Sequence, residues 1–329
     1  VEALDASGNV TLLPRTTAFG YYNHNHVALA ERLSDHLANP PENLPRERLW
    51  QVRAKQVVLA TGSHERPLVF PNNDRPGVML ADAMRVFLNR YAVVPGRKTL
   101  IATTGASAYQ SALDLKDAGV DVTIADLRLA EDCGSELAAA RAHGIEVLSA
   151  HTVVDVLGKA RVTGIALAPI STDGSVGDAF TLACDSIGMS GGWTPSVHLF
   201  SQSRGKLTYD ADRDMFLPGH AVQHVASIGS CAGDLSLTSV VRSSVDFATE
   251  LAGSLGVEAA KETAPAVETN DWIAFQPTRI MPTRGDANRQ RAFVDFQNDV
   301  TAKDVKLAVR EGFESIEHVK RYTTTGMAT

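Results

Sequence analysis

The chain has 329 residues, more than one hydrophobic core usually covers, so we expect two or three domains. Hydrophobic residues make up 44% and charged residues 21%, which are ordinary globular values and argue against a disordered or fibrous protein. The formal net charge of −7 argues against nucleic acid or an anionic membrane as the main partner, and no apolar run reaches the roughly 20 residues of a membrane-spanning helix.

The cysteines and the ends of the chain set two further expectations. Cys133, Cys184 and Cys231 stand far apart without a C-x-x-C spacing, so a disulfide framework, a zinc site and a redox dithiol all lack support. We therefore expect a cytoplasmic protein. The sequence begins at Val1 without methionine and stops at Thr329 without a natural ending, so we expect a piece of a longer polypeptide.

The first fifty residues contain two predicted strands, at 10–13 and 16–22. Residues 23–26 put two imidazoles on one face of a strand, which could hold a metal ion, but no third ligand stands nearby. A polar hairpin turn is the favoured interpretation. Residues 27–37 are expected to be helix or loop, and residues 38–48, with three prolines, a surface loop.

The segment 55–67 is the one around which the chain is organised. Val57 to Leu59 reads as a buried strand, and the small residues Ala60, Thr61 and Gly62 then let backbone approach a ligand. A charged exit ending in Pro67 follows. This pattern resembles the second dinucleotide-contacting strand of two-dinucleotide-binding-domain flavoproteins, the glutathione-reductase class.

A second βαβ unit follows an amphipathic helix predicted over residues 78–91. A strand at 99–102, a turn at 103–108, a helix at 109–118 and a strand at 122–125 ending in Asp126 form the pattern of a Rossmann unit. Thr103 and Ala108 stand where glycines are expected, and the Cβ of Thr103 crowds the turn that should hold a pyrophosphate. We expect a Rossmann-like unit and favour an empty nucleotide site over a working one.

The middle of the chain returns to the first domain. A helix is predicted over 130–143, antiparallel strands from 145 to about 184 with a hairpin turn at 171–174, and a crossover over 184–195. Residues 225–230 form a strand ending in Gly229 and Ser230. In related FAD proteins an aspartate stands at the position of Ser230 and binds the ribityl chain. Asp234 either replaces that aspartate or only caps the helix that follows; both interpretations remain open.

The last part is a linker over 256–291 and then a small helical domain, with a helix at 302–311 capped by Thr301 and another from 315 to 321. This domain resembles bacterioferritin-associated ferredoxins. Cluster-binding relatives have a C-x-C pair where this sequence has Asp295 and Gln297. Because neither side chain replaces a thiolate, we expect no iron–sulfur cluster.

The whole chain, most specifically residues 190–206, resembles the α subunits of heterotetrameric sarcosine oxidases. The resemblance implies an α/β fold of the two-dinucleotide-binding-domain, glutathione-reductase-like class, followed by the small helical domain without cluster ligands. The expected boundaries are 1–97 for part of the first dinucleotide (NAD) domain, 98–185 for the inserted Rossmann-like domain, 186–257 for the return, 258–290 for the linker and 291–329 for the incomplete helical domain.

The resemblance also implies a function. An FAD on the β subunit oxidises sarcosine, electrons pass to FMN at the α/β interface, oxygen becomes peroxide, and the imine carbon leaves as formaldehyde or joins tetrahydrofolate. The α subunit holds NAD and works with β, γ and δ subunits, without catalytic or metal-binding residues of its own in this chain. The NAD-binding positions it implies are Thr17, Ala18, Ala60, Thr61, Gly62, Gly229 and Ser230. Thr323, Thr324, Thr325 and Gly326 are assigned to the FMN interface.

Three alternatives remain. The first is a free-standing NAD(P)H-dependent flavin reductase, which the altered turn at 103–108 and the scattered cysteines disfavour. The second is a non-catalytic scaffold stabilised by its nucleotide, which is compatible with an α subunit. The third is the α subunit of another amine or imino-acid oxidase. No Ser-His-Asp or paired-carboxylate spacing supports hydrolysis.

Overall fold

The computed structural model describes residues 2–258, 262–268, 271–285 and 290–327. The chain forms two compact units. The first unit comprises Val1–His64 and Thr194–Thr269, and the second comprises Glu65–Trp193 and Asn270–Thr329. The chain therefore leaves the first unit, returns to it, and leaves it a second time to end in the second unit.

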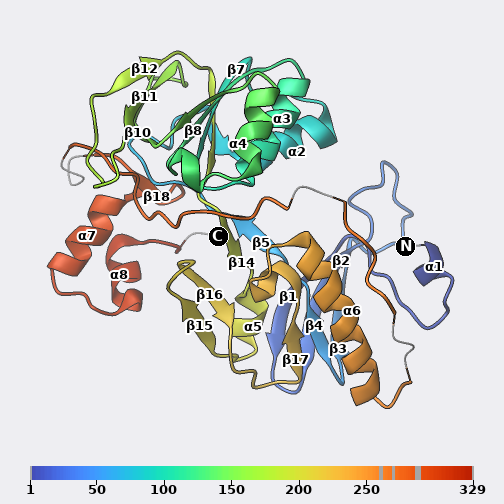
Figure 1. Cartoon of the computed structure of the whole chain (residues 1–329). Coiled ribbons are helices and arrows are strands. Elements are labelled where there is room, and N and C mark those ends of the chain that lie inside the picture. The colour runs from blue at the N-terminus through green and yellow to red at the C-terminus, as the bar shows by residue number, and fades with distance from the viewer. Residues whose placement is uncertain (1, 259–261, 269–270, 286–289, 328–329) are drawn as a thin grey trace. The chain divides into compact units, whose positions relative to one another are not determined.

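An antiparallel sheet of order β1-β2-β3 opens the first unit (Figure 1). β1 (Thr16–Tyr22) and β2 (His26–Arg32) form a hairpin, and β3 (Glu47–Arg53) pairs with β2 along its whole length. The prediction of helix or loop for residues 27–37 is therefore wrong over β2. Its alanines and Glu31 favour a helix in isolation, but pairing on both sides satisfies the strand backbone.

The turn between β1 and β2 confirms the predicted hairpin. His24 and Asn25 both take left-handed backbone angles, with φ of 61° and 51°. The buried Asn25 side chain accepts a hydrogen bond from the Tyr21 hydroxyl at 2.9 Å and donates to the Lys55 and His224 carbonyls. Asparagine tolerates this conformation and here satisfies three polar groups at once, so these hydrogen bonds hold the turn.

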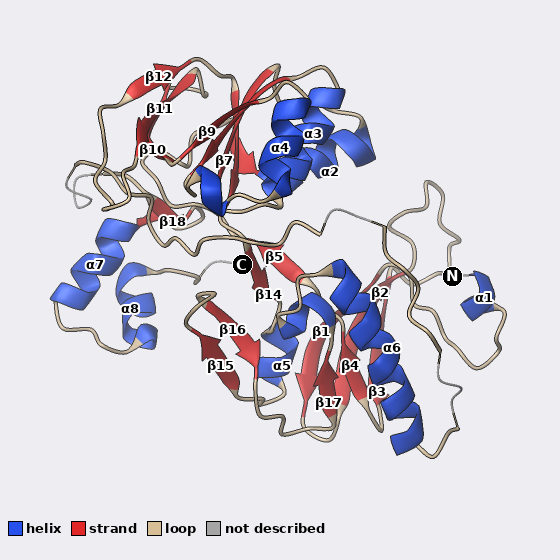
Figure 2. Cartoon of the chain, viewed as in Figure 1, coloured by secondary structure: helices blue, strands red, loops and turns tan. Residues whose placement is uncertain are grey.

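The rest of the first unit surrounds a small core of Tyr21, Leu59, Phe200, Val225 and Cys231. A parallel pair, an antiparallel hairpin and two main helices supply its elements (Figure 2). These are β4 (Val57–Leu59) with β17 (Val225–Ser227), β15 (Leu207–Asp210) with β16 (Met215–Pro218), α5 (His198–Gln202) and α6 (Leu237–Ser254), besides the short α1 (Glu2–Asp5) and the 3-10 turn η2 (Gly229–Ala232). β5 (Ser63–Glu65) pairs with β14 (Trp193–Pro195) where the chain crosses between units.

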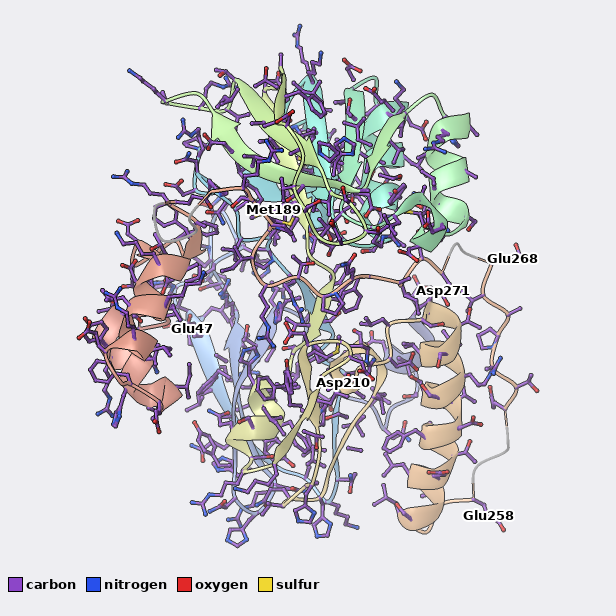
Figure 3. The ribbon with its side chains drawn as sticks, turned by 60° about the vertical axis from the view of Figure 1, so that its left-hand side comes forward. Glu47, Met189, Asp210, Glu258, Glu268 and Asp271 are labelled. Atoms are coloured by element: carbon purple, nitrogen blue, oxygen red, sulfur yellow. The ribbon has the colours of Figure 1, made fainter. Side chains whose placement is uncertain are left out.

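The second unit is built on a five-stranded parallel sheet of order β6-β13-β7-β8-β9. Side chains alternate across it: Ile101 packs with the helices on one face, while Leu100 and Ala102 pack with an antiparallel sheet on the other. Met189 lies buried on the latter side (Figure 3). The elements are β6 (Val78–Leu80), α2 (Ala81–Tyr91), β7 (Lys98–Thr103), α3 (Ala108–Asp117), β8 (Asp121–Asp126), η1 (Ala130–Asp132), α4 (Ser135–Ala142), β9 (Glu146–Ser149), β10 (His151–Leu157), β11 (Gly164–Pro169), β12 (Phe180–Leu182) and β13 (Ser186–Ser190).

Three predicted elements of this unit are corrected by the structure. The first three residues of the helix predicted over 78–91 form β6, because they pair with β13. The helix predicted over 130–143 splits into η1 and α4 at Gly134. β9 does not begin the antiparallel strands; it is the parallel edge strand beside β8. A partner strand in the sheet, or in one case the interruption of a helix at Gly134, therefore determines the secondary structure that the local sequence left ambiguous.

The small C-terminal part of the second unit contains β18 (Phe293–Asp295), β19 (Val300–Thr301), α7 (Ala302–Arg310) and α8 (Ile316–Thr323). The predicted cap of α7 is confirmed. The Asp304 carboxylate accepts hydrogen bonds from both the backbone N–H and the hydroxyl of Thr301, at 2.9 and 2.6 Å. This fixes the start of α7 directly after the β18–β19 hairpin.

Candidate functional site

The carboxyl ends of β4 and β17 meet at one edge of the first unit. Leu59 lies opposite Ser227, and the Ile228 N–H donates to the Leu59 carbonyl at 3.0 Å. Since strands of a parallel pair end at the same edge, the segments that follow them, 60–62 and 229–230, are brought together. Five of the seven predicted NAD-binding residues thus share one place in the fold, and it is an edge of the kind where open α/β sheets bind ligands.

Two glycines keep this edge open. Gly62 and Gly229 have φ of 76° and 69°, a conformation that favours glycine. A Cβ added at Gly62 would meet its first neighbour, the Ser230 hydroxyl, only at 4.0 Å. The hydroxyl of Ser227 is buried and has no hydrogen-bond partner among the described residues. Exposed backbone next to an unsatisfied hydroxyl fits a polar ligand such as a dinucleotide.

Ala18 and Thr61 line a common hollow of about 380 Å³, together with Phe19, Ser196, His198, Leu199 and Gln202. The Thr61 hydroxyl donates to the Ser196 carbonyl at 2.8 Å, which holds this wall in place. Thr17, the neighbour of Ala18 on β1, lines a different hollow beside Arg15, Arg32 and His36. The structure thus separates the side chains of Thr17 and Ala18, two of the predicted NAD-binding residues, because successive strand residues point to opposite faces.

Asp234 belongs to the start of α6. Ser236 is the N-cap and accepts from the Ser239 N–H at 3.2 Å. The Asp234 carboxylate accepts from the Ser239 hydroxyl at 2.7 Å and lies 3.5 Å from that of Ser243. A negative charge here favours the helix N-terminus, so Asp234 supports the start of α6, although its N-cap is Ser236 and not Asp234.

The turn of the second Rossmann-like unit is closed on itself. The Gly105 N–H donates to the Thr103 hydroxyl at 3.0 Å, and that hydroxyl donates to the Gly105 carbonyl at 2.9 Å. The Thr104 N–H donates to the Ser190 carbonyl at 3.1 Å. The Thr103 hydroxyl therefore occupies the Gly105 N–H, and the Ser190 carbonyl occupies the Thr104 N–H; both are groups that a phosphate would need.

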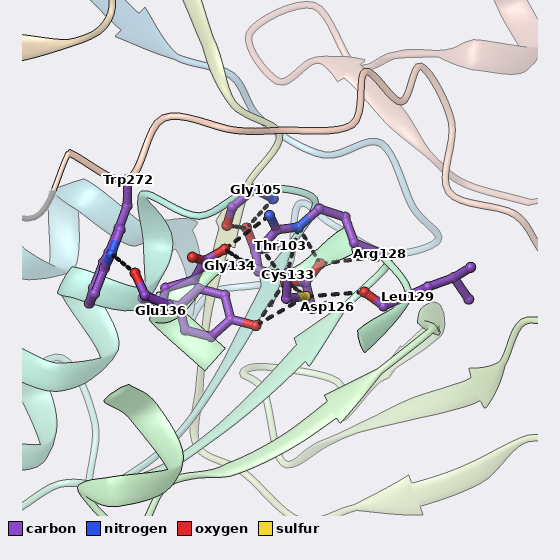
Figure 4. Close-up of polar contacts among 11 residues, drawn as sticks. Thr103, Gly105, Asp126, Arg128, Leu129, Cys133, Gly134, Glu136 and Trp272 are labelled. Carbon is purple, nitrogen blue, oxygen red and sulfur yellow. Dashed lines mark hydrogen bonds and ion pairs between the residues drawn. The ribbon is translucent and has the colours of Figure 1, made fainter. Parts of the chain in front are cut away.

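Asp126 ends β8, at the position where Rossmann units carry an acidic residue for the ribose hydroxyls, and it is fully buried in a polar network (Figure 4). It accepts from the Tyr109 hydroxyl at 2.9 Å and forms an ion pair with Arg128 at 2.7 Å. Nη1 of Arg128 lies 3.1 Å from Glu136, close enough for an ion pair although not aligned as a hydrogen bond. Burial alone would lower the pKa of Arg128, but the hydrogen bonds and charge of Asp126 raise it, so the cation persists at every accessible pH.

Asp295 stands at one of the two positions that the resemblance assigns to cluster cysteines, and its carboxylate is engaged locally. It accepts from the side chain of Asn298 at 2.9 Å and from the Gly326 N–H at 2.7 Å. These hydrogen bonds, with those from the Gln297 and Asn298 N–H groups, lower the pKa of Asp295 to about 2. The carboxylate thus ties the end of α8 to β18.

We expect Asp295→Asn to loosen α8 at neutral pH. Because the folded pKa of about 2 lies below the unfolded value of about 3.9, the ionised group stabilises the fold above pH 4, and this stabilisation is lost as the pH falls toward 2. The protection factors of residues 316–327, which compare each exchange rate with its intrinsic rate at the same pH, should therefore fall between about pH 4 and 2 in the parent and show no such step in the variant. Asp299→Asn, on the same turn, is the control; a variant that keeps the step would contradict the assignment.

The residues assigned to the FMN interface lie in the second unit at the end of α8. The Thr323 hydroxyl donates to the Val319 carbonyl at 2.8 Å and lies 2.7 Å from the hydroxyl of Thr325. Thr324 is in the left-handed conformation, with φ of 64°, and ends the helix. The hydroxyls of Thr323 and Thr325 thus form hydrogen bonds within the C-terminal end of α8. The backbone N–H of the exposed Gly326 donates to the Asp295 carboxylate.

Glu65 is a buried acid that the sequence pattern left as part of a charged exit. Its carboxylate accepts from the Asp82 N–H at the start of α2, at 2.9 Å, and it is 9% exposed. Burial raises the pKa of Glu65 to about 7, and the hydrogen bond from Asp82 offsets only part of this. The group therefore changes charge near neutral pH inside the second unit.

We expect Glu65→Gln to be more stable than the parent above pH 7. Since the folded pKa exceeds the unfolded value of about 4.3, the parent has its full stability below pH 4 and loses on the order of 3 kcal/mol as the pH rises to 7. Glutamine keeps the hydrogen bond from Asp82 and has no charge to bury. Denaturant unfolding at pH 5 and 8 measures this, with the exposed Glu146→Gln as control; equal pH dependence in parent and Glu65→Gln would refute it.

Neither a metal site nor a membrane helix is found within the described ranges. These ranges contain no group of three or more His, Cys, Asp and Glu side chains able to hold a metal ion. They also contain no helix whose length and hydropathy suffice to cross a membrane.

Comparison with known proteins identifies the class that this fold defines. Residues 6–249 match the family model of the pyridine nucleotide-disulphide oxidoreductases, and the chain belongs to this family. Residues 289–329 match the sarcosine oxidase A3 domain. The predicted fold class, a two-dinucleotide-binding-domain architecture followed by a small helical domain, is confirmed.

The resemblance to sarcosine oxidase α subunits is also confirmed. The chain is 38% identical to sarcosine oxidase subunit alpha of Rhizobium meliloti (strain 1021) over 100% of its length, and 37% identical to that of Corynebacterium sp. (strain U-96) over 99%. It spans about a third of these relatives, 32% and 34% of their lengths. Among solved structures, L-proline dehydrogenase from P. horikoshii shares the fold, with a TM-score of 0.57 and 18% identity over 95% of this chain and 55% of that one.

Proposed function

We propose that this chain is the NAD-holding part of the α subunit of a heterotetrameric sarcosine oxidase. The observation that carries the proposal is the edge where β4 and β17 end, with Gly62 and Gly229 left-handed and Ser230 at the tip. A serine in place of an aspartate removes the acidic anchor for a ribityl chain while leaving hydroxyl and backbone groups for a dinucleotide. The similarity to sarcosine oxidase subunits over the whole chain supports the same reading.

The residues present would hold NAD by backbone and small polar groups. Ala60, Thr61, Gly62, Gly229 and Ser230 would face it from the strand ends. The backbone of Thr17 and Ala18 would lie at its adenine, with the two side chains lining different hollows. Bound NAD can accept a hydride in general, but here we propose a structural role without turnover. By mass action, a ligand at about 100 times its dissociation constant stabilises the fold by about 2.7 kcal/mol.

The chemistry of the assembly is proposed to occur outside this chain. Sarcosine, oxygen and water would give glycine, formaldehyde and hydrogen peroxide, with FAD on the β subunit and FMN at the α/β interface near Thr323, Thr324, Thr325 and Gly326. Tetrahydrofolate would accept the one-carbon unit as the alternative to formaldehyde release. The β, γ and δ subunits are the proposed partners, in the cytoplasm, and the position of Asp295 supports a helical domain without an iron–sulfur cluster.

Acid extraction of the purified native assembly, followed by identification of each nucleotide released from the separated subunits, tests the proposal. We expect one NAD per α subunit and no FAD on it. FAD on the α subunit would overturn the argument from Ser230, and iron with labile sulfide would overturn that from Asp295. Amine oxidation by the isolated α subunit would contradict the division of roles.

A further inference from the structure

The segment after residue 270 lies on the turn of the second Rossmann-like unit. Gly105 and Phe275 form an antiparallel bridge. The Ala106 N–H donates to the Ala274 carbonyl at 2.7 Å, and the Gln276 N–H donates to the Thr104 carbonyl at 2.7 Å. The turn and the segment are therefore joined by backbone hydrogen bonds like two strands of a sheet.

These bonds complete the closure of the turn. The N–H groups of Thr104 and Gly105 donate to the Ser190 carbonyl and the Thr103 hydroxyl. The N–H of Ala106, the next residue, donates to the Ala274 carbonyl. In a working dinucleotide site these consecutive N–H groups face the pyrophosphate. A carbonyl oxygen, like a phosphate oxygen, is a negatively polarised acceptor for such N–H groups. The segment thus supplies an acceptor of the chain's own in place of a phosphate oxygen.

Phe275 fills the adjoining space. A Cβ added at Gly105 would approach the Phe275 Cβ to 2.7 Å, and one added at Gly192, in the loop after β13, would approach its ring to 2.5 Å. The Arg66 guanidinium lies 5.9 Å from the centre of the ring. Both glycines stand at the carboxyl ends of neighbouring strands, β7 and β13, which is where open α/β sheets bind their ligands.

The segment is anchored at its beginning, and polar groups that follow β7 and end β8 already have partners. The Trp272 Nε1 donates to the Ser135 hydroxyl at 3.2 Å, at the start of α4 (Figure 4). The Trp193 Nε1 donates to the Ser107 hydroxyl at 3.0 Å, on the last residue before α3. Asp126, which would hold ribose hydroxyls, is already paired with Arg128.

We propose that residues 271–276 occupy the nucleotide pocket of the second unit as a built-in pseudo-ligand, so that this unit binds no dinucleotide. The Ala274 carbonyl stands in for the pyrophosphate and the Phe275 ring for a base or nicotinamide. The proposal goes beyond the NAD site of the first unit and is independent of it. It also removes the second site that a free-standing NAD(P)H-dependent reductase would use.

Hydrogen exchange on the full chain in its native assembly tests the proposal. We expect slow exchange at residues 104–106 and 274–276, unchanged by millimolar NADH, NADPH or ADP-ribose. Phe275→Ala should speed exchange of both stretches together, by at least about tenfold. Phe87→Ala, an exposed phenylalanine on α2 of the same unit, is the matched control and should leave both stretches unchanged.

Saturable binding of a second dinucleotide by the parent protein, with faster exchange at residues 274–276, would overturn the proposal. So would a Phe275→Ala protein in which residues 104–106 keep their protection. The ligand titration needs no variant, so the proposal stays testable if Phe275→Ala fails to fold. NAD in the first unit is counted separately by acid extraction, which keeps failure of that proposal distinguishable from failure of this one.

Discussion

Arg128→Met should destabilise the second unit by about 3–5 kcal/mol, the cost of breaking a buried ion pair by removing one partner. The Arg128 side chain is 4% exposed and stands between the carboxylates of Asp126 and Glu136, which are 0% and 4% exposed. Methionine fills a similar volume but leaves two buried negative charges without a cation. Thermal unfolding should show a fall in Tm of roughly 10 °C for a unit of this size.

The matched control for this prediction is Arg46→Met. Arg46 also pairs with an aspartate at 2.7 Å, Asp35, but its side chain is 77% exposed, so its loss should leave stability unchanged within error. Adding Asp126→Asn to Arg128→Met should recover part of the lost stability, because one uncompensated charge disappears. A double variant no more stable than the single one would mean that packing, and not charge, is the role of Arg128.

The elements that sequence predicted well are those with strong local signals. The α3 helix follows a glycine turn, and α7 begins at a capping pair of Thr301 and Asp304. The prediction from sequence was wrong where strand pairing determines the secondary structure. β2 carries alanines and a glutamate that favour a helix, yet it is a strand paired with β1 and β3. Such pairing joins residues far apart in the chain, and no local pattern contains it.

The candidate sites divide in the same way. The sequence alone indicated the small residues after β4 and β17 as a candidate site, because a ligand that approaches the backbone requires such residues. The closing of the second site was predicted only in part: Thr103 signalled a damaged turn, but nothing local linked it to Phe275, some 170 residues later. Even Gly105, which reads as a phosphate-binding residue, accommodates a side chain of the same protein.

The two edges therefore allow opposite predictions for similar glycines. At Gly192 and Gly105 the missing Cβ makes room for Phe275, so substitution there should disturb the fold. For a Cβ added at Gly62, the one neighbour within 4 Å among the described residues is the Ser230 hydroxyl, at 4.0 Å, so the space is open to the ligand that we propose. The nucleotide that we propose for the first unit could therefore be lost without disturbing internal packing.

Gly62→Val should therefore deplete the NAD that we propose for the first unit. Valine at a φ of 76° adds strain of about 1–3 kcal/mol and places a branched side chain where the dinucleotide would approach, so its affinity should fall by at least about tenfold. The measurement is NAD per α subunit after gel filtration and acid extraction. Gly174→Val is the matched control, since Gly174 has a φ of 82° and no neighbour within 4 Å but lies in a hairpin turn of the second unit. The control carries the same backbone strain and should retain its nucleotide; full retention by Gly62→Val as well would show that the edge formed by β4 and β17 does not hold the dinucleotide.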